Sequence, residues 1–308
     1  MKSRKNEQRG KNGRKSNQDA LRRAVKWIIN DEIFSHLRFH GNTNWVASQL
    51  VILAVFWVWS DNPSLVAAFS EAHQLVVRLF GRAAVSSYQG LTKALMTWTS
   101  TLLPCLWNRL HELMERCDGK SWRVGVWVVL AVDGSRFSVP RTVANENRFC
   151  ASKKNKNKRR KKKKKKGVPK KKNYKPQPVG PQVWLTLIWH VGLRLPWCWE
   201  IGPSDSSERA HFLKMLEHEY PENTLFCGDA GFVGYEFWKT IHDKDHHFLV
   251  RVGANVRLLK KLGWYVRERE GIVYSWPDEA VKKKRPPLTL RLLHFKDSRG
   301  DVYLVTNV

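Results

Sequence analysis

A run of nine residues, Val124 to Val132, restricts the fold of this chain more than any other stretch of the sequence. It is continuously apolar, rich in β-branched valine, and lacks the polar alternation of a strand that faces water. This pattern is typical of a strand buried on both faces of a sheet. Helices must then cover both sides of that sheet, so the sequence predicts an α/β domain. The run ends at Asp133-Gly134, where we expect the strand to end.

The segments that follow alternate between strand and helix patterns. Two apolar stretches joined through Gly192 favour a hairpin. Ser204 then opens a helix, in which we expect Asp205 to cap the N-terminus and Glu208 to reach back as in a capping box. In order, the predicted elements are strands over 124–132, 183–190 and 195–201, a helix from 204, a strand over 224–229, a helix over 235–242 and a strand over 247–252. This is the element order of an RNase H-like mixed sheet.

Residues 20–117 have a different pattern of apolar residues. Apolar positions recur there at helical spacing, with Ser64 as a candidate N-cap and weaker breaks at Gly81 and Gly90. The most membrane-like run, Trp45 to Trp59, spans roughly 15 residues, fewer than the ~20 that a membrane-spanning helix needs. We therefore expect an all-α domain with a buried core helix, and no membrane segment.

The net charge of +28 is carried mainly by two segments. Lys153 to Lys175 hold 16 basic residues and no acidic ones, and Lys2 to Lys26 hold 10 basic residues. Segments this charged and this poor in apolar residues cannot offset the entropy of ordering, so we expect disorder at residues 1–19 and 152–178. The 15 Trp and 13 Phe residues of the chain exclude disorder throughout, because that apolar surface must be buried. A polyanion is the expected partner.

The cysteines argue for a reducing compartment. There are five of them, an odd number, widely spaced and without a C-x-x-C pair, which disfavours a disulfide framework or a zinc ribbon. The N-terminus is basic, but no apolar signal region follows it closely. The sequence therefore predicts a cytoplasmic protein.

Two aspartates, Asp133 and Asp229, each follow an apolar strand and lie beside glycine. If the two strands are neighbours, the carboxylates converge at the sheet edge where α/β proteins place ligands. Converging carboxylates repel one another unless a divalent cation lies between them, and hard oxygen ligands suit Mg²⁺ or Mn²⁺. Taken singly, Asp133 has an ordinary structural reading as the start of an Asp-Gly turn, and Asp229 as the cap of the helix that follows. The pair in this strand order favours the functional interpretation.

Four segments carry a more specific resemblance: Ala131 to Phe137, Ser206 to Ala210, Leu225 to Tyr235 and Phe248 to Asn255. Together they resemble the transposases of bacterial insertion sequences of the IS-four type, in the DDE superfamily with its RNase H-like core. The resemblance covers about residues 120–308. It implies a catalytic core over 121–252 and the start of a β-rich insertion domain over 253–308. Residues 20–117 stand where the family has its DNA-binding region.

The resemblance also implies a function. Asp133 and Asp229 fall at the family's first and second catalytic aspartates, which bind Mg²⁺ or Mn²⁺. The implied activity is DNA transposition, by metal-dependent cleavage and strand transfer at terminal inverted repeats. The implied partners are double-stranded DNA, as terminal repeats and as target, and a second copy of the chain in a homodimer.

The third catalytic acid of the family is a glutamate in a Y-x2-R-x3-E-x6-K signature on a final helix, and nothing in this sequence matches it. Tyr303 to Asn307 resembles the strand that ends the family's insertion, and the sequence stops one residue later. We therefore expect a C-terminally truncated polypeptide. Among the other acids, Glu236 is on the wrong helix, so we do not expect it to substitute. We expect the same of the acids in the expected insertion, which are Asp278, Glu279 and Asp301. The alternative function is a catalytically inactive DNA-binding remnant or inhibitor.

Three further features have a functional and a structural reading. The lysine run, between the first two core strands, is either a flexible arm on DNA phosphates or a solvated insertion. Arg251 either holds a phosphate near the site or forms a structural ion pair, and Trp264 either contacts a flipped base or packs in a core. The lysines at the centre of the run are Lys161, Lys162, Lys163, Lys164, Lys165 and Lys166.

Overall fold

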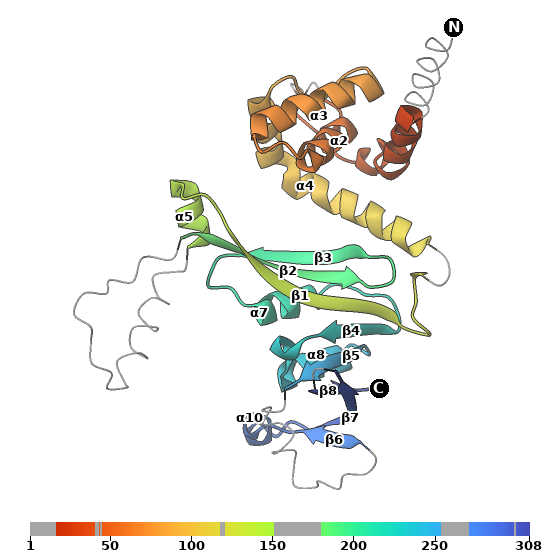
Figure 1. Cartoon of the computed structure of the whole chain (residues 1–308), viewed down its shortest axis with the longest axis vertical. Coiled ribbons are helices and arrows are strands. Elements are labelled where there is room, and N and C mark those ends of the chain that lie inside the picture. Colours follow the sequence, from red (N-terminus) through yellow and green to blue (C-terminus); the bar gives the residue numbers. More distant parts are fainter. Residues whose placement is uncertain are drawn as a thin grey trace, which may run out of the picture. The chain divides into compact units, whose positions relative to one another are not determined.

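Two units make up the chain in the computed structural model, and the division falls between Cys117 and Asp118, where the sequence pattern changes (Figure 1). The structure describes residues 17–40, 43, 45–117, 121–150, 180–253, 271–298 and 300–308. Each unit has its own secondary-structure type. The first is built from helices and the second from a mixed sheet with helices packed on it.

The first unit is all-helical in its described residues. A helix over residues 17–28 is followed by the short helix η1 (Glu32–Phe34), α2 (Ala47–Trp59), α3 (Leu65–Phe80) and α4 (Tyr88–Glu115). Residues 17–19 were expected in a disordered arm, and for these three the expectation is wrong. None of the described helices combines the length and apolar character needed to cross a membrane.

The ends of α3 follow the predicted capping chemistry. The Ser64 hydroxyl accepts a hydrogen bond from the Ala67 N–H, and Gly81 ends the helix in the left-handed region with φ of 81°. Gly90 does not break a helix as expected. It lies in the first turn of α4, where its N–H is bonded by the N-cap residue Ser87. The buried core of this unit comes from α2, α3 and α4, with Leu50, Leu53 and Leu91 fully buried.

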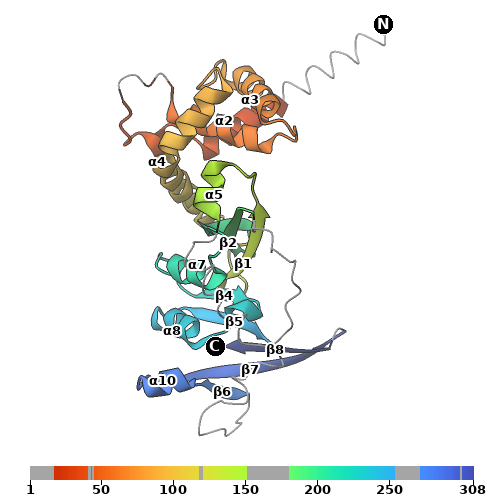
Figure 2. The same cartoon turned by 90° about the vertical axis from the view of Figure 1, so that its left-hand side faces the viewer.

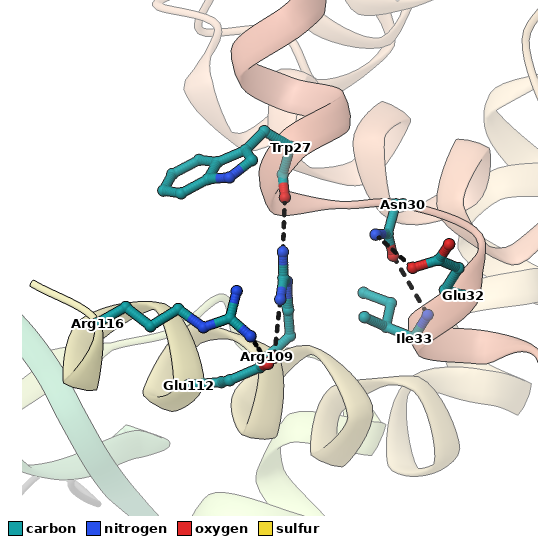
Figure 3. Close-up of polar contacts among 7 residues, drawn as sticks. All are labelled: Trp27, Asn30, Glu32, Ile33, Arg109, Glu112 and Arg116. Atoms are coloured by element: carbon teal, nitrogen blue, oxygen red, sulfur yellow. Dashed lines mark hydrogen bonds and ion pairs between the residues drawn. The ribbon is translucent and has the colours of Figure 1, made fainter.

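Arg109 ties α4 to the helix over residues 17–28 (Figure 3). Its Nη2 donates to the Trp27 carbonyl at 3.0 Å, and its Nη1 pairs with Glu112 at 2.8 Å. Glu112 also pairs with Arg116, one turn further on. The Arg109 side chain is only 11% exposed, so this link is part of the packing of the unit.

The second unit is an eight-stranded sheet with the order β3-β2-β1-β4-β5-β8-β7-β6. β1 pairs in parallel with β4, and β4 with β5, whereas β2 and β3 form an antiparallel meander on the other side of β1. The expected RNase H-like α/β core is confirmed by this order of the first five strands. The strands are β1 (Val128–Ser138), β2 (Gln182–His190), β3 (Leu195–Gly202), β4 (Thr224–Gly228), β5 (His247–Val252), β6 (Ile272–Ser275), β7 (Leu288–Asp297) and β8 (Gly300–Thr306).

The first strand differs from its prediction at both ends. It begins at Val128, because Gly125 adopts φ of 63° and turns the chain so that Val124 and Trp127 form an isolated bridge. It does not end at Asp133. Antiparallel pairing with β2 continues through Ser138, well beyond the last parallel pair with β4.

Burial along β1 also differs from the prediction of two buried faces. Val128, Leu130 and Val132 are buried, while Val129 and Ala131 between them are only partly buried. The physical reason is that the described helices α7 (Glu208–Met215) and α8 (Tyr235–Asp243) lie on one side of the sheet (Figure 2). Phe212 of α7 stacks on Phe237 of α8 at 6.1 Å between ring centroids.

The described part of residues 253–308 extends the same sheet. β8 pairs antiparallel with β5, and β7 and β6 follow outward. The helix α10 (Asp278–Lys282) leads into a segment that is joined to α8, where Arg285 pairs with Glu236 at 2.6 Å. The short helices α5 (Val143–Phe149) and η3 (Ala230–Phe232) complete the described elements of this unit.

Candidate active site

The register of the parallel strands brings the two predicted aspartates together. Val132 of β1 is paired with Gly228 of β4, so Asp133 and Asp229 occupy the next position on two adjacent strands. Both residues are exposed. Buried apolar strands therefore support two surface carboxylates at the carboxyl ends of the parallel pairing, where a ligand can reach them.

Local hydrogen bonds orient both carboxylates. Asp133 Oδ1 accepts from the Gly134 N–H at 2.7 Å, and Asp229 Oδ1 accepts from the Gly231 N–H at 2.7 Å. The prediction that Asp229 caps the helix that follows is therefore confirmed, since its side chain caps the short helix η3. The reading of Asp133 as the start of a turn is wrong, because Asp133 and Gly134 both pair with β2 inside β1.

Glu208 is a third acid beside this pair, and the sequence prediction missed it. It is the first residue of α7, whose N-cap is Ser207 rather than the expected Asp205. The Ser207 hydroxyl accepts from the Ala210 N–H at 3.1 Å, so the cap does not depend on the Glu208 carboxylate. A signal was present, since Glu208 lies in the segment Ser206 to Ala210, but its predicted role was only that of a capping-box residue.

The electrostatics of Glu208 reflect its surroundings. Partial burial raises the pKa of its carboxyl group, and the negative charges of Asp229 and then Asp133 raise the pKa further. Arg136 opposes this with a smaller effect. The charges of both predicted aspartates therefore act on one neighbouring carboxylate, which places the three acids in one electrostatic site.

Three arginines surround the site. Arg251 lies one position beyond Val250, the residue paired with Gly228, so it reaches the same level of the sheet as Asp229. Arg136 stacks on its cross-strand partner Trp184, with the guanidinium 3.7 Å from the ring centroid. Arg209 Nε donates to the Gly231 carbonyl at 2.8 Å, which fastens α7 to the loop after Asp229.

The other predicted site residues cannot be placed relative to this edge, because they belong to parts of the chain that the structure does not describe. Lys161, Lys162, Lys163, Lys164, Lys165 and Lys166 lie outside the described residues, as does Trp264. Trp276, also in the expected insertion, is described, and its Nε1 donates to the Arg285 carbonyl at 2.8 Å. This bond gives Trp276 a structural role near α10.

The donor set fits a divalent cation as a two-carboxylate site. Asp133 and Asp229 are hard oxygen ligands on adjacent strands, with exposed side chains on a rigid base. Among the residues that the structure describes, no three His, Cys, Asp or Glu side chains are grouped closely enough to hold a metal ion. Glu208 is therefore not counted as a third ligand, and what relates it to the pair is the effect of the two aspartate charges on its pKa.

Comparison with known proteins identifies the family of the second unit. Residues 127–299 match the family model of the transposase DDE domain, and the chain belongs to this family. DDE transposases generally use divalent metal ions. The matched range includes Asp133, Glu208, Asp229 and Arg251.

One solved structure similar to this chain is that of the piggyBac transposase synaptic complex with hairpin DNA. The identity is 12% and the TM-score 0.35, and the similarity covers 92% of this chain and 57% of that one. The chain thus spans a little over half the length of the piggyBac transposase chain. No curated protein matches the sequence.

Proposed function

We propose that the chain is a DNA transposase of the insertion-sequence kind, of the IS-four type, and that Asp133 and Asp229 are its metal-binding catalytic acids. The observation that supports the proposal is the β1–β4 register, in which Asp133 and Asp229 each directly follow the last parallel pair, Val132 with Gly228, within the matched DDE domain. Its substrates are the terminal repeats of its element and target DNA.

The residues of the site have distinct parts in this chemistry. Asp133 and Asp229 would hold Mg²⁺ or Mn²⁺, which when bound activates water and stabilises charge on a scissile phosphate. The N–H groups of Gly134 and Gly231 fix one oxygen of each carboxylate and so orient both side chains. Arg251, which lies at the same level of the sheet, would bind a DNA phosphate.

The excess of positive charge supports DNA as the partner. The chain has 55 Lys and Arg residues against 27 Asp and Glu, concentrated in two segments. Such segments neutralise phosphates without reading bases, so they supply affinity and not sequence preference. Assembly of two copies on paired DNA ends belongs to this proposal, because both ends of one element have to be joined to the same target DNA.

The test is cleavage of a plasmid that carries the DNA flanking this coding sequence on both sides. We expect nicks at the element ends that require Mg²⁺ or Mn²⁺. Asp133→Asn and Asp229→Asn should each reduce nicking by at least about 100-fold, the loss typical of removing an electrostatic group from an active site. Asp61→Asn, an exposed acid in the helical unit, is the matched control and should have no effect.

Two results would count against the proposal. Nicking that survives both Asp133→Asn and Asp229→Asn would show that the chemistry lies elsewhere. Shifted DNA bands without any metal-dependent nicking would favour the second candidate function, a catalytically inactive DNA-binding protein. The inactive DNA-binding protein is considered because, within the described ranges, no three His, Cys, Asp or Glu side chains are grouped closely enough to hold a metal ion.

A further inference from the structure

We propose that Glu208 is a third acidic group of the Asp133–Asp229 site and raises its affinity for a divalent cation. The inference rests on the proposed function, since it concerns the cation which that function requires. It assigns a role in cation binding to α7, an element for which the sequence indicated only a capping role.

The first argument is the space left for Glu208 above β1. A Cβ added at Gly134 would overlap Cγ of Glu208 and lie 2.7 Å from its Oε1. Glu208 therefore lies directly against the backbone of the residue that follows Asp133. Glycine at 134 is what permits this approach, because every other residue would place a side-chain carbon there.

The second argument is the position of the other carboxylate oxygen. Glu208 Oε2 lies 3.5 Å from where a Cβ of Gly231 would be, and Asp229 Oδ1 lies 2.8 Å from the same point. The two carboxylates are thus close neighbours beside the loop that follows β4. One end of the Glu208 carboxylate borders the backbone of Gly134, the residue next to Asp133, and the other end borders the Asp229–Gly231 loop.

The third argument is that the position is electrostatically unfavourable without a cation. Glu208 is partly buried beside two acids, and no ion pair with Glu208 is seen in the described part of the chain. Arg209 donates to the Gly231 carbonyl and Arg136 stacks on the Trp184 ring, so the charge of Arg136 offsets only part of the repulsion at Glu208. Three clustered negative charges repel one another, and a divalent cation would remove that repulsion.

A purely structural role for Glu208 accounts for less of this geometry. An acid in the first turn of a helix is favourable to the helix dipole, but that benefit needs no approach to Gly134. The cap of α7 is made by Ser207. The structural role therefore predicts that the effect of removing Glu208 is independent of metal, whereas a role in cation binding predicts the opposite.

The experiment measures Mn²⁺ binding to the full chain by electron paramagnetic resonance, without DNA. We expect Glu208→Gln to weaken Mn²⁺ binding by about 10-fold or more, as for other changes around a metal site. Glu217→Gln, an exposed acid just beyond the C-terminus of α7, is the matched control and should bind as the wild type. Unaltered Mn²⁺ affinity in Glu208→Gln would overturn the inference.

Thermal unfolding supplies a second readout. Without metal, Glu208→Gln should melt at or above the wild-type temperature, because a repulsive charge is gone. With saturating Mn²⁺ the order should reverse, since the wild type gains more from the cation. A difference between the two proteins that is the same with and without Mn²⁺ would assign Glu208 a structural role only.

A variant at Gly134 tests the geometry while leaving all three charges in place. Gly134→Ala should displace Glu208 and weaken Mn²⁺ binding in the wild type, yet have little further effect when Glu208 is already alanine. Equal losses in both backgrounds would contradict the inference. Asp133→Asn separates this inference from the proposed function. If that variant keeps full Mn²⁺ affinity, the two-aspartate site itself fails, whatever the result at Glu208.

Discussion

The acids of the site differ in how far their roles could be predicted from sequence. Asp133 and Asp229 each follow a run of apolar residues, and a strand pattern that ends in an acid is a local signal. Their proximity then follows from the strand order alone. Glu208 has an adequate local explanation as a helix-start residue, so nothing in its neighbourhood in the sequence points further. Its closeness to Gly134 joins segments that are far apart in the chain, and only the packing of α7 on β1 shows it.

Buried histidines of the second unit make its stability depend on pH. His190 is fully buried at the end of β2, and its Nδ1 accepts the Leu193 N–H at 3.1 Å. Burial lowers the pKa of His190, because the charged ring is poorly solvated there. Burial lowers the pKa of His211 and His246 in the same way.

We expect the second unit to lose stability as the pH falls below about 6.5. Above that value these rings are neutral in both states, and their contribution is fully present. Below it the unfolded chain takes up protons first, so unfolding becomes more favourable until the pH passes the lowered folded pKa values. Urea unfolding from pH 8 to 5 would measure this. His190→Asn keeps a neutral acceptor and should flatten the curve, whereas exposed His242→Gln should leave it unchanged.

At the scale of elements, the order of strands and helices was predictable and their ends were not. The apolar runs and caps identify which segments pair or coil, and the RNase H-like order follows from their sequence. The end of β1 depends on its partners. Pairing with β4 stops at Val132, but pairing with β2 continues to Ser138. No feature of residues 133–138 in the sequence predicts that the strand extends this far. Likewise, apolar residues on both faces of β1 do not show which face the described helices cover.

The junction of β5 and β8 depends on one side chain. Asn307, which follows β8, accepts the Phe248 N–H on its Oδ1 at 2.9 Å and donates from its Nδ2 to the His246 carbonyl at 3.0 Å. The side-chain amide of Asn307 thus makes two hydrogen bonds to the backbone around the start of β5, one as acceptor and one as donor.

We expect Asn307→Ala to destabilise the second unit by about 2 kcal/mol, because two backbone groups that are partly buried lose their partners. Asn307→Asp keeps the acceptor but puts a negatively charged oxygen against the His246 carbonyl oxygen, so its loss should be comparable or greater. Val308→Ala, at the next and exposed position, should change the unfolding free energy little. Chemical denaturation followed by tryptophan fluorescence measures all three. If Asn307→Ala unfolds like the wild type, the β5–β8 junction does not depend on this amide.

At the scale of the whole molecule, most of the positive charge lies in segments of the sequence other than those that carry the candidate catalytic aspartates. The two units hold apolar cores, while Lys153 to Lys175 and Lys2 to Lys26 carry most of the net charge of +28. The aspartate site attracts a cation through its negative charge. The binding of DNA phosphates requires positive charge. Keeping the basic residues in segments distinct from the strand ends lets one chain supply both.

This separation predicts how DNA affinity responds to salt. Each phosphate that a lysine or arginine neutralises contributes about 0.9 to the slope of log K against log salt concentration. Replacing residues 153–175 by a Gly-Ser linker of equal length should therefore flatten the slope by several units, measured by fluorescence anisotropy on duplex DNA. Asp133→Asn should leave the slope nearly unchanged, because a site carboxylate releases no DNA counterions. An unaltered slope in the linker variant would show that the lysine run does not contact DNA, and the affinity would then have to come from the N-terminal basic segment or from the folded units.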